Sequence, residues 1–101
     1  MQGFVVRDPK FTRREVADIL GVSPLTIANR EKRGQYPPPR RDLNNYREYS
    51  LREVFNLQIL SFGYIDRRPI VSILFDKGFK DQKELGKLLD ATEAQQKGVA
   101  L

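Results

Sequence analysis

Residues 11–34 read FTRREVADILGVSPLTIANREKRG, and this pattern predicts two short helices joined by a tight turn. Thr12 stands just before the first helix and Glu15 follows three residues later. At this spacing a threonine hydroxyl and a glutamate side chain cap the first turn reciprocally. Apolar residues then recur at helical spacing and predict a buried face made of Val16, Ile19 and Leu20. Gly21 can adopt the left-handed backbone that ends a helix, so the first helix is expected to end there.

The second helix is expected to begin at Ser23-Pro24. Serine is a favourable N-cap, and proline fits the first helical position because its missing N–H group would be unpaired there anyway. Gly34 is expected to end this helix. Two helices joined by a turn of about four residues form the helix-turn-helix pattern, whose second helix enters the major groove of DNA.

Composition restricts the chemistry that the chain can perform. The 101 residues suit a single domain and include no Cys and no His. Disulfides, thiol chemistry, the usual zinc sites and a histidine base are therefore excluded. The acidic residues show no paired arrangement suited to acid–base catalysis, so we expect no enzymatic activity, no metal and no cofactor.

The sequence contains no apolar run that approaches a membrane span, and residues 1–10 are too short and too charged for a signal peptide. We therefore expect a cytoplasmic, nucleoid-associated protein without a membrane partner. The net charge is +5, and residues 24–47 alone hold six basic residues against two acidic ones. Such a concentrated basic patch favours a polyanionic partner.

Residues 35–49 read QYPPPRRDLNNYREY and predict a hairpin. The three prolines enforce an extended backbone and exclude both a helix and a central strand. Asp42 and Asn44-Asn45 are turn formers, and asparagine tolerates the left-handed conformation that tight hairpins need. With residues 46–49 as the returning strand, the segment predicts a small two-stranded wing with a basic first arm.

Three more helices are expected after the wing. Ser50 and Glu53 repeat the capping spacing, and Gly63 ends the third helix. Asp66 or Arg68, together with Pro69, is expected to start a fourth helix, which Gly78 ends. These two helices supply apolar faces for a shared core.

Asp81 and Glu84 form a third capping pair and predict a fifth helix, but the apolar pattern weakens after Asp90. We therefore expect a mainly α fold, a winged helix-turn-helix with a small two-stranded wing and additional C-terminal helices. The expected divisions are an N-terminal lead-in (1–10), a DNA-binding domain (11–90) and a flexible tail (91–101).

The second helix carries the candidate DNA-reading residues. Asparagine can bond adenine bidentately and arginine can do the same to guanine, so Asn29 and Arg30 are the candidate base readers. Thr26, Lys32 and Arg33 suit phosphate oxygens, which fix position without reading sequence. A solvated charged face is the alternative for any basic helix. The preceding helix, the turn and the basic wing favour DNA contact here.

Further arginines are candidates outside this helix. Arg40, Arg41 and Arg47 belong to the predicted wing, where an arginine can enter a minor groove or clamp a phosphate. Arg67 and Arg68 stand at the start of the fourth helix, where free N–H groups bind phosphate. A solvated loop explains this last pair equally well.

Residues 11–34, followed by PPPRRDLNNYREYSLREV, resemble the N-terminal DNA-binding domain of the MerR family. The resemblance covers about residues 11–89 and is carried by the motifs GVSP, REKRG, PPPRR and YREYS. It implies that the helix from Pro24 to Arg33 enters the major groove and that Tyr46 and Arg47 contact the DNA backbone. The general fold is also similar to that of phage excisionases and small terminase subunits.

The chain departs from the MerR pattern in three ways. The family usually has Arg and an aromatic residue where this chain has Ala28, Asn29 and Arg30, so we expect a base preference of its own. Asn45 replaces the usual glycine before the wing tyrosine. Family activators continue into a long dimerising coiled coil and an effector domain, whereas this chain ends shortly after Asp90 and lacks the thiolates of the metal-sensing members.

The expected function is sequence-specific binding of double-stranded DNA by a small transcriptional regulator without an effector domain or a small-molecule effector. One alternative is a phage or plasmid architectural protein that acts in excision, packaging or segregation. Another is a protein–protein adaptor that exposes its fourth and fifth helices. The residues after Gly78 offer too few apolar positions for a coiled coil. We therefore expect a monomer in solution that self-associates on tandem DNA sites.

Overall fold

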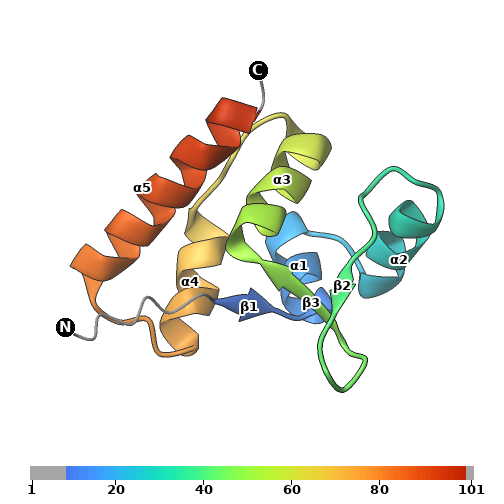
Figure 1. Cartoon of the computed structure of the whole chain (residues 1–101), viewed down its shortest axis with the longest axis horizontal. Helices are drawn as coiled ribbons and strands as arrows, with labels where there is room; N and C mark the ends of the chain where they lie inside the picture. The colour runs from blue at the N-terminus through green and yellow to red at the C-terminus, as the bar shows by residue number, and fades with distance from the viewer. Residues whose placement is uncertain (1–8, 100–101) are drawn as a thin grey trace.

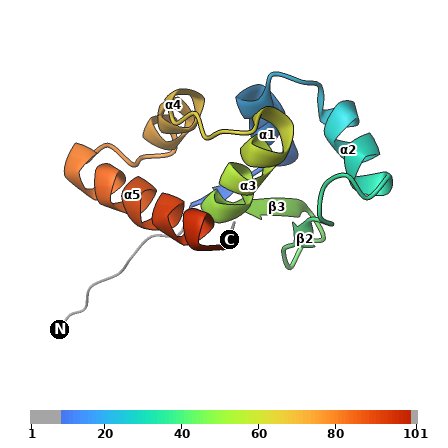
Figure 2. The same cartoon turned by 90° about the horizontal axis from the view of Figure 1, so that it is seen from above.

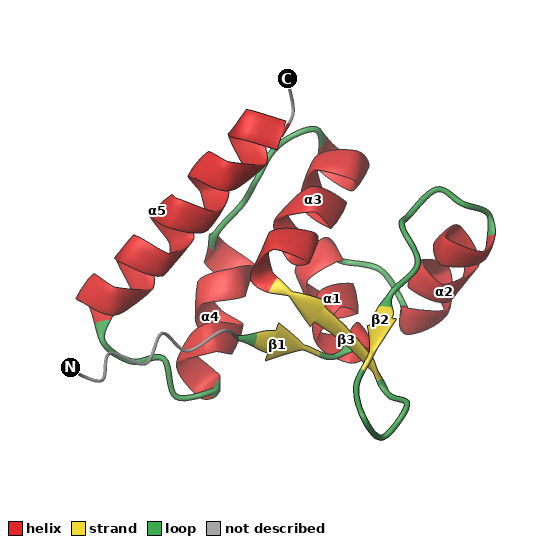
Figure 3. Cartoon of the chain, in the orientation of Figure 1, coloured by secondary structure: helices red, strands yellow, loops and turns green. Residues whose placement is uncertain are grey.

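A computed structural model describes the backbone of residues 9–99 and the side chains of residues 9–96. This part of the chain holds five helices and three short strands (Figures 1 and 3). In chain order they are β1 (Lys10–Phe11), α1 (Arg13–Leu20), α2 (Pro24–Lys32), β2 (Arg40–Arg41), β3 (Arg47–Ser50), α3 (Leu51–Phe62), α4 (Arg68–Asp76) and α5 (Gln82–Val99). The prediction of a mainly helical fold with one small sheet is confirmed.

The predicted caps start the helices. The Thr12 hydroxyl accepts a hydrogen bond from the Glu15 backbone N–H at 3.1 Å, and Glu15 Oε1 accepts one from the Thr12 N–H at 2.8 Å. Ser50 and Glu53 make the same reciprocal pair at 3.1 and 2.7 Å. Each cap satisfies N–H groups that the first turn leaves unpaired, so these helix starts are set locally.

The turn between α1 and α2 also follows the sequence. Gly21 adopts a left-handed φ of 71°, and the Val22 N–H donates to the Ala17 carbonyl at 3.0 Å. Ser23 Oγ then accepts the Thr26 N–H at 3.1 Å and caps α2. The two helices are thus joined by three residues whose backbone groups are largely paired, which fixes the direction in which α2 leaves α1.

The core forms where α1 contacts α2, α3 and α4. Its buried apolar residues include Val16, Leu20, Ile27, Val54, Phe55, Ile70 and Leu74. In α2, Ile27 is the one fully buried residue, with 0% of its surface exposed. Its burial contributes about 1.5–3 kcal/mol to the free energy of unfolding. The rest of α2 remains at the surface.

The sheet has a third strand that the sequence analysis did not predict. Its order is β1-β3-β2, with both pairs antiparallel, and Phe11 of β1 pairs with Tyr49. The two-stranded hairpin that was expected as the wing is present as β2 and β3, and β1 extends the sheet to three strands, with Lys10 paired to Ser50. Two residues are too few to show strand alternation, and the pairing depends on a partner far along the chain. Residues 1–8 of the expected lead-in lie outside the described residues.

The last helix is longer than predicted. α5 continues to Val99, so residues 91–99 of the expected tail are helical, and residues 100–101 lie outside the described part. Gln96 explains the extension, because only 6% of its surface is exposed and its Nε2 donates to Asn56 Oδ1 of α3 at 3.1 Å. None of the helices within residues 9–99 combines the length and the apolar character that crossing a membrane requires.

Candidate nucleic-acid interface

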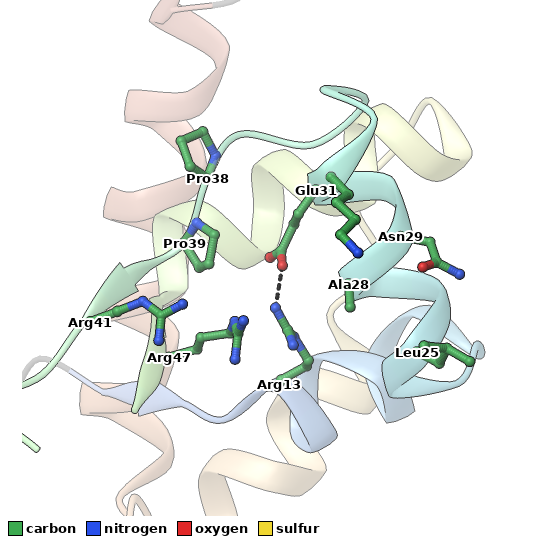
Figure 4. A pocket seen from close by; sticks show the side chains of 10 residues that line it. Arg13, Leu25, Ala28, Asn29, Glu31, Pro38, Pro39, Arg41 and Arg47 are labelled. Atoms are coloured by element: carbon green, nitrogen blue, oxygen red, sulfur yellow. Dashed lines mark hydrogen bonds and ion pairs between the residues drawn. The ribbon is translucent and has the colours of Figure 1, made fainter. Parts of the chain in front are cut away.

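A groove of about 450 Å³ runs between α2 and the β2–β3 hairpin (Figure 4). We call it the α2–hairpin groove. Its wall on the α2 side is formed by Leu25, Ala28, Asn29, Glu31 and Lys32, and its wall on the other side by Pro38, Pro39, Arg41 and Arg47. Residues 25, 28, 29 and 32 follow the i, i+3, i+4, i+7 spacing of a single helix face. One stripe of α2 therefore faces the groove.

The groove is positively charged. Lys32, Arg41 and Arg47 line it, and within the described residues none of the three forms an ion pair. Arg41 and Arg47 are directly opposed across the β2–β3 pair. Directly opposed residues lie on the same face of a hairpin, and like charges in that position destabilise it. An anion bound between the two guanidinium groups would remove this repulsion.

An ion-paired network forms the base of the groove, where Arg13 of α1 contacts Glu31 of α2 and Tyr49 of β3. The Arg13 guanidinium donates to Glu31 Oε1 (dashed in Figure 4), and the Tyr49 hydroxyl donates to Glu31 Oε2 at 2.6 Å. Only 7% of the Glu31 side chain is exposed. Burial, followed by the Glu31 carboxylate, raises the pKa of Tyr49 to about 12. The network neutralises Arg13 and fixes α2 against α1 and β3.

The hairpin turn is held by Asp42. Its Oδ1 accepts the backbone N–H groups of Asn44 at 2.9 Å and Tyr46 at 3.0 Å. Asn45 has a φ of 67°, the left-handed conformation for which a glycine is the usual residue. Asparagine is one of the few other residues that adopt it. The predicted turn chemistry is confirmed, and it fixes the hairpin that carries Arg41 and Arg47.

Arg30 does not line the α2–hairpin groove, although the sequence analysis paired it with Asn29 as a base reader. Its Nη1 donates to the Tyr36 hydroxyl at 2.7 Å, and its Cζ lies 5.5 Å from the centre of the Tyr36 ring. Tyr36 is buried, with 4% of its surface exposed, and its hydroxyl also contacts Ser61 of α3. Arg30 therefore ties α2, through Tyr36, to the turn that follows it and to α3.

Four other predicted residues also lie outside the groove lining. Thr26 Oγ1 is hydrogen-bonded to Ser23 Oγ at 2.9 Å, within the cap of α2. Arg33 is the exposed C-cap of α2. Arg40 pairs with Glu53 of α3 at 3.0 Å, since adjacent strand residues point to opposite faces and only Arg41 faces the groove. Tyr46, at the exposed hairpin turn, is not part of the lining either.

Arg67 and Arg68 lie on another side of the molecule. α2 and the α4–α5 pair flank α1 and α3 on opposite sides (Figure 2). Arg67 pairs with Asp90 and Glu93 of α5, both at 2.9 Å, and Arg68 pairs with Asp66 at 3.1 Å. The same Arg68 contacts hold the pKa of the Asp66 carboxyl below its ordinary value. These arginines join α4 to its surroundings, and the structure does not bring them to the groove.

Of the predicted DNA-binding residues, the structure brings Asn29, Lys32, Arg41 and Arg47 together. It adds Leu25, Arg13 and Glu31, which the sequence analysis missed. No spacing rule could have related Arg13 to Glu31, which lies 18 residues away on a different helix. The exposure of Leu25 follows from its position on the helix face opposite Ile27.

The described residues contain no group of three or more carboxylates placed to hold a metal ion. Comparisons of the chain with protein-family models, with curated proteins and with solved structures found no match.

Proposed function

We propose that this protein binds double-stranded DNA sequence-specifically, as a small MerR-like regulator of transcription. In this proposal α1 and α2 act as a helix-turn-helix and the β2–β3 hairpin acts as its wing. The groove-facing stripe of α2 enters the major groove, and the hairpin contacts the phosphate backbone beside it. Neighbouring molecules on tandem sites would contact one another.

The directly opposed Arg41 and Arg47 carry this proposal. A hairpin that places two like charges side by side loses stability unless an anion lies between them. Lys32 faces the same groove from α2, so the three cations converge on one space. A phosphate backbone offers a row of anions that fits such a cluster, and Arg can bind each phosphate through two N–H groups.

The salt dependence of binding tests the proposal. Contacts to about three phosphates give a slope of about −2.7 for log K against log[salt], so affinity should fall about 40-fold between 50 and 200 mM salt. Fluorescence anisotropy would measure binding of the full chain to duplexes selected from a random library. Failure to bind duplex DNA, or binding that ignores salt, would refute the proposal.

A protein–protein adaptor is the second candidate. Leu60, Phe62 and Tyr64 are exposed at the end of α3, and the rings of Phe62 and Tyr64 stack at 5.6 Å. The stacked rings of Phe62 and Tyr64 form an exposed apolar cluster, which is typical of a protein contact. It differs from the expected adaptor surface on the fourth and fifth helices. Partner binding through this cluster would be nearly independent of salt.

A further inference from the structure

The groove-facing stripe of α2 has two apolar side chains, Leu25 and Ala28, and Leu25 is the more exposed of the two. It lies in the first turn of α2, and 68% of its surface is exposed. A recognition helix contacts base edges mainly through its N-terminal residues, so Leu25 occupies a position from which bases are read. Single exposed leucines are common on proteins. This one shares its helix face with Ala28 and Asn29.

The chemistry of that face differs from the one the sequence suggested. Arg30, the candidate reader of guanine, is bonded to Tyr36 outside the groove. Near the start of α2, the side chains that face the groove are the apolar Leu25 and Ala28 and the amide of Asn29. An amide bonds the N6 and N7 atoms of adenine, and an apolar side chain contacts the C5-methyl group of thymine. Both preferences select A·T pairs. Lys32, the last residue of α2, lies on the same stripe but two turns from Leu25, beside the hairpin arginines.

Spacing allows both contacts at once. Residues four apart on a helix have Cβ atoms about 5–6 Å apart, and successive bases of one strand are separated by about 3.4 Å. Leu25 and Asn29 would therefore reach base pairs that are adjacent or one step removed.

We propose that α2 reads A·T base pairs, with Leu25 contacting the C5-methyl group of a thymine and Asn29 bonding a nearby adenine. The inference rests on the proposed DNA binding. It adds that the bound site has A·T pairs opposite α2 and that Leu25 helps to select them. Leu25 acts here through shape and apolar burial and makes no hydrogen bond to the base.

Replacement of thymine by deoxyuridine tests the contact, because it removes only the methyl group and keeps base pairing. Duplexes carrying the selected site would be made with each thymine replaced in turn. For the wild-type protein, replacement at one or two positions should lower affinity about 4-fold, the effect expected when one methyl group is no longer buried. The Leu25→Ala variant should bind the thymine site more weakly and should not distinguish thymine from deoxyuridine.

Leu60→Ala is the matched control, because Leu60 is also an exposed leucine (52%) but lies on α3 away from the groove. It should keep the full deoxyuridine effect. Thermal melts of both variants should match the wild type, since truncation of an exposed side chain leaves no cavity. Replacement of adenine by 7-deazaadenine near the sensitive thymine should weaken the wild type and leave Asn29→Ala unchanged.

Two results would overturn the inference alone: selected sites with G·C pairs opposite α2, or an equal deoxyuridine effect in the wild type and Leu25→Ala. In both cases steep salt dependence would still support DNA binding. Absence of duplex binding would overturn this inference together with the proposed function.

Discussion

Asn29 and Arg30 are neighbours in the sequence but have different surroundings, because successive helix residues differ by about 100° in direction. Asn29 faces the α2–hairpin groove, whereas Arg30 contacts the buried Tyr36. The sequence identified both as candidate readers from their side-chain chemistry. It could not separate them, since Tyr36 meets Arg30 only where the chain turns back at the end of α2, with the Tyr36 N–H donating to the Arg30 carbonyl at 3.2 Å.

Alanine substitutions should separate the two roles. Arg30→Ala should lower the free energy of unfolding by about 1.5–3 kcal/mol, because a hydrogen bond from a charged donor is lost, and leave base preference unchanged. Asn29→Ala should cost about 1–3 kcal/mol of specific DNA affinity at particular base pairs. Because alanine is the better helix former, it should not lower stability. Thermal melts measure the stability of the two variants, and fluorescence anisotropy on the selected site measures their DNA affinity and base preference. A change of base preference in Arg30→Ala would contradict the separation.

Tyr49 makes the free energy of unfolding depend on pH in the alkaline range. Burial and the neighbouring Glu31 raise its pKa from 10.0 to about 12 in the folded protein. The protonated phenol is therefore favoured by folding, and its contribution is fully present below pH 10. As pH rises from about 10 to 12 the unfolded chain loses this proton first, so the free energy of unfolding should fall.

Urea unfolding at several pH values between 9 and 12 would measure this effect. Tyr49→Phe should be less stable at pH 9, because the hydroxyl bonds to Glu31 and Arg13 are lost, and should show a shallower decline with pH. Tyr64→Phe is the control, since Tyr64 is exposed, and should follow the wild type. Equal slopes for wild type and Tyr49→Phe would show that another group titrates.

At the scale of elements, the predictions that succeeded depend on residues two to four positions apart. The Thr12 and Ser50 caps and the Asp42 turn are closed by their immediate neighbours, so a local pattern identifies them. β1 and the end of α5 were missed because their partners are distant. Phe11 pairs with Tyr49, and Gln96 bonds Asn56 across 40 residues. The groove itself exists only when α2 and the hairpin are placed side by side.

The hairpin turn provides a test at this scale. Asn45→Ala should destabilise the protein by about 1 kcal/mol, because alanine resists the left-handed backbone that asparagine tolerates. Asn45→Gly should be neutral or stabilising. Asn44→Ala is the control, since Asn44 contributes its backbone N–H to the turn and alanine keeps that group. Thermal melts would detect the difference. Equal stability of Asn45→Ala and Asn45→Gly would mean that the turn relaxes without cost.

At the scale of the whole molecule, positive charge is used in two ways on opposite sides. The α2–hairpin side presents Lys32, Arg41 and Arg47 without ion pairs among the described residues. On the α4–α5 side, Arg67 pairs with Asp90 and Glu93. The net charge of +5 does not reveal this division. DNA binding through the groove should therefore depend on where a charge is removed rather than on how many are removed.

Arg47→Ala and Arg67→Ala remove the same charge from the two sides and test this directly. Arg47→Ala should weaken binding to all DNA sequences and reduce the salt slope by about 0.9, the loss of one phosphate contact. Arg67→Ala should leave affinity and slope unchanged. Its loss of stability should be about 1 kcal/mol, since ion pairs that stay partly exposed to solvent contribute little. Anisotropy titrations at four salt concentrations measure the slopes. If the two variants lost affinity equally, binding would respond to net charge alone, and the α2–hairpin groove would not be the DNA-contacting surface.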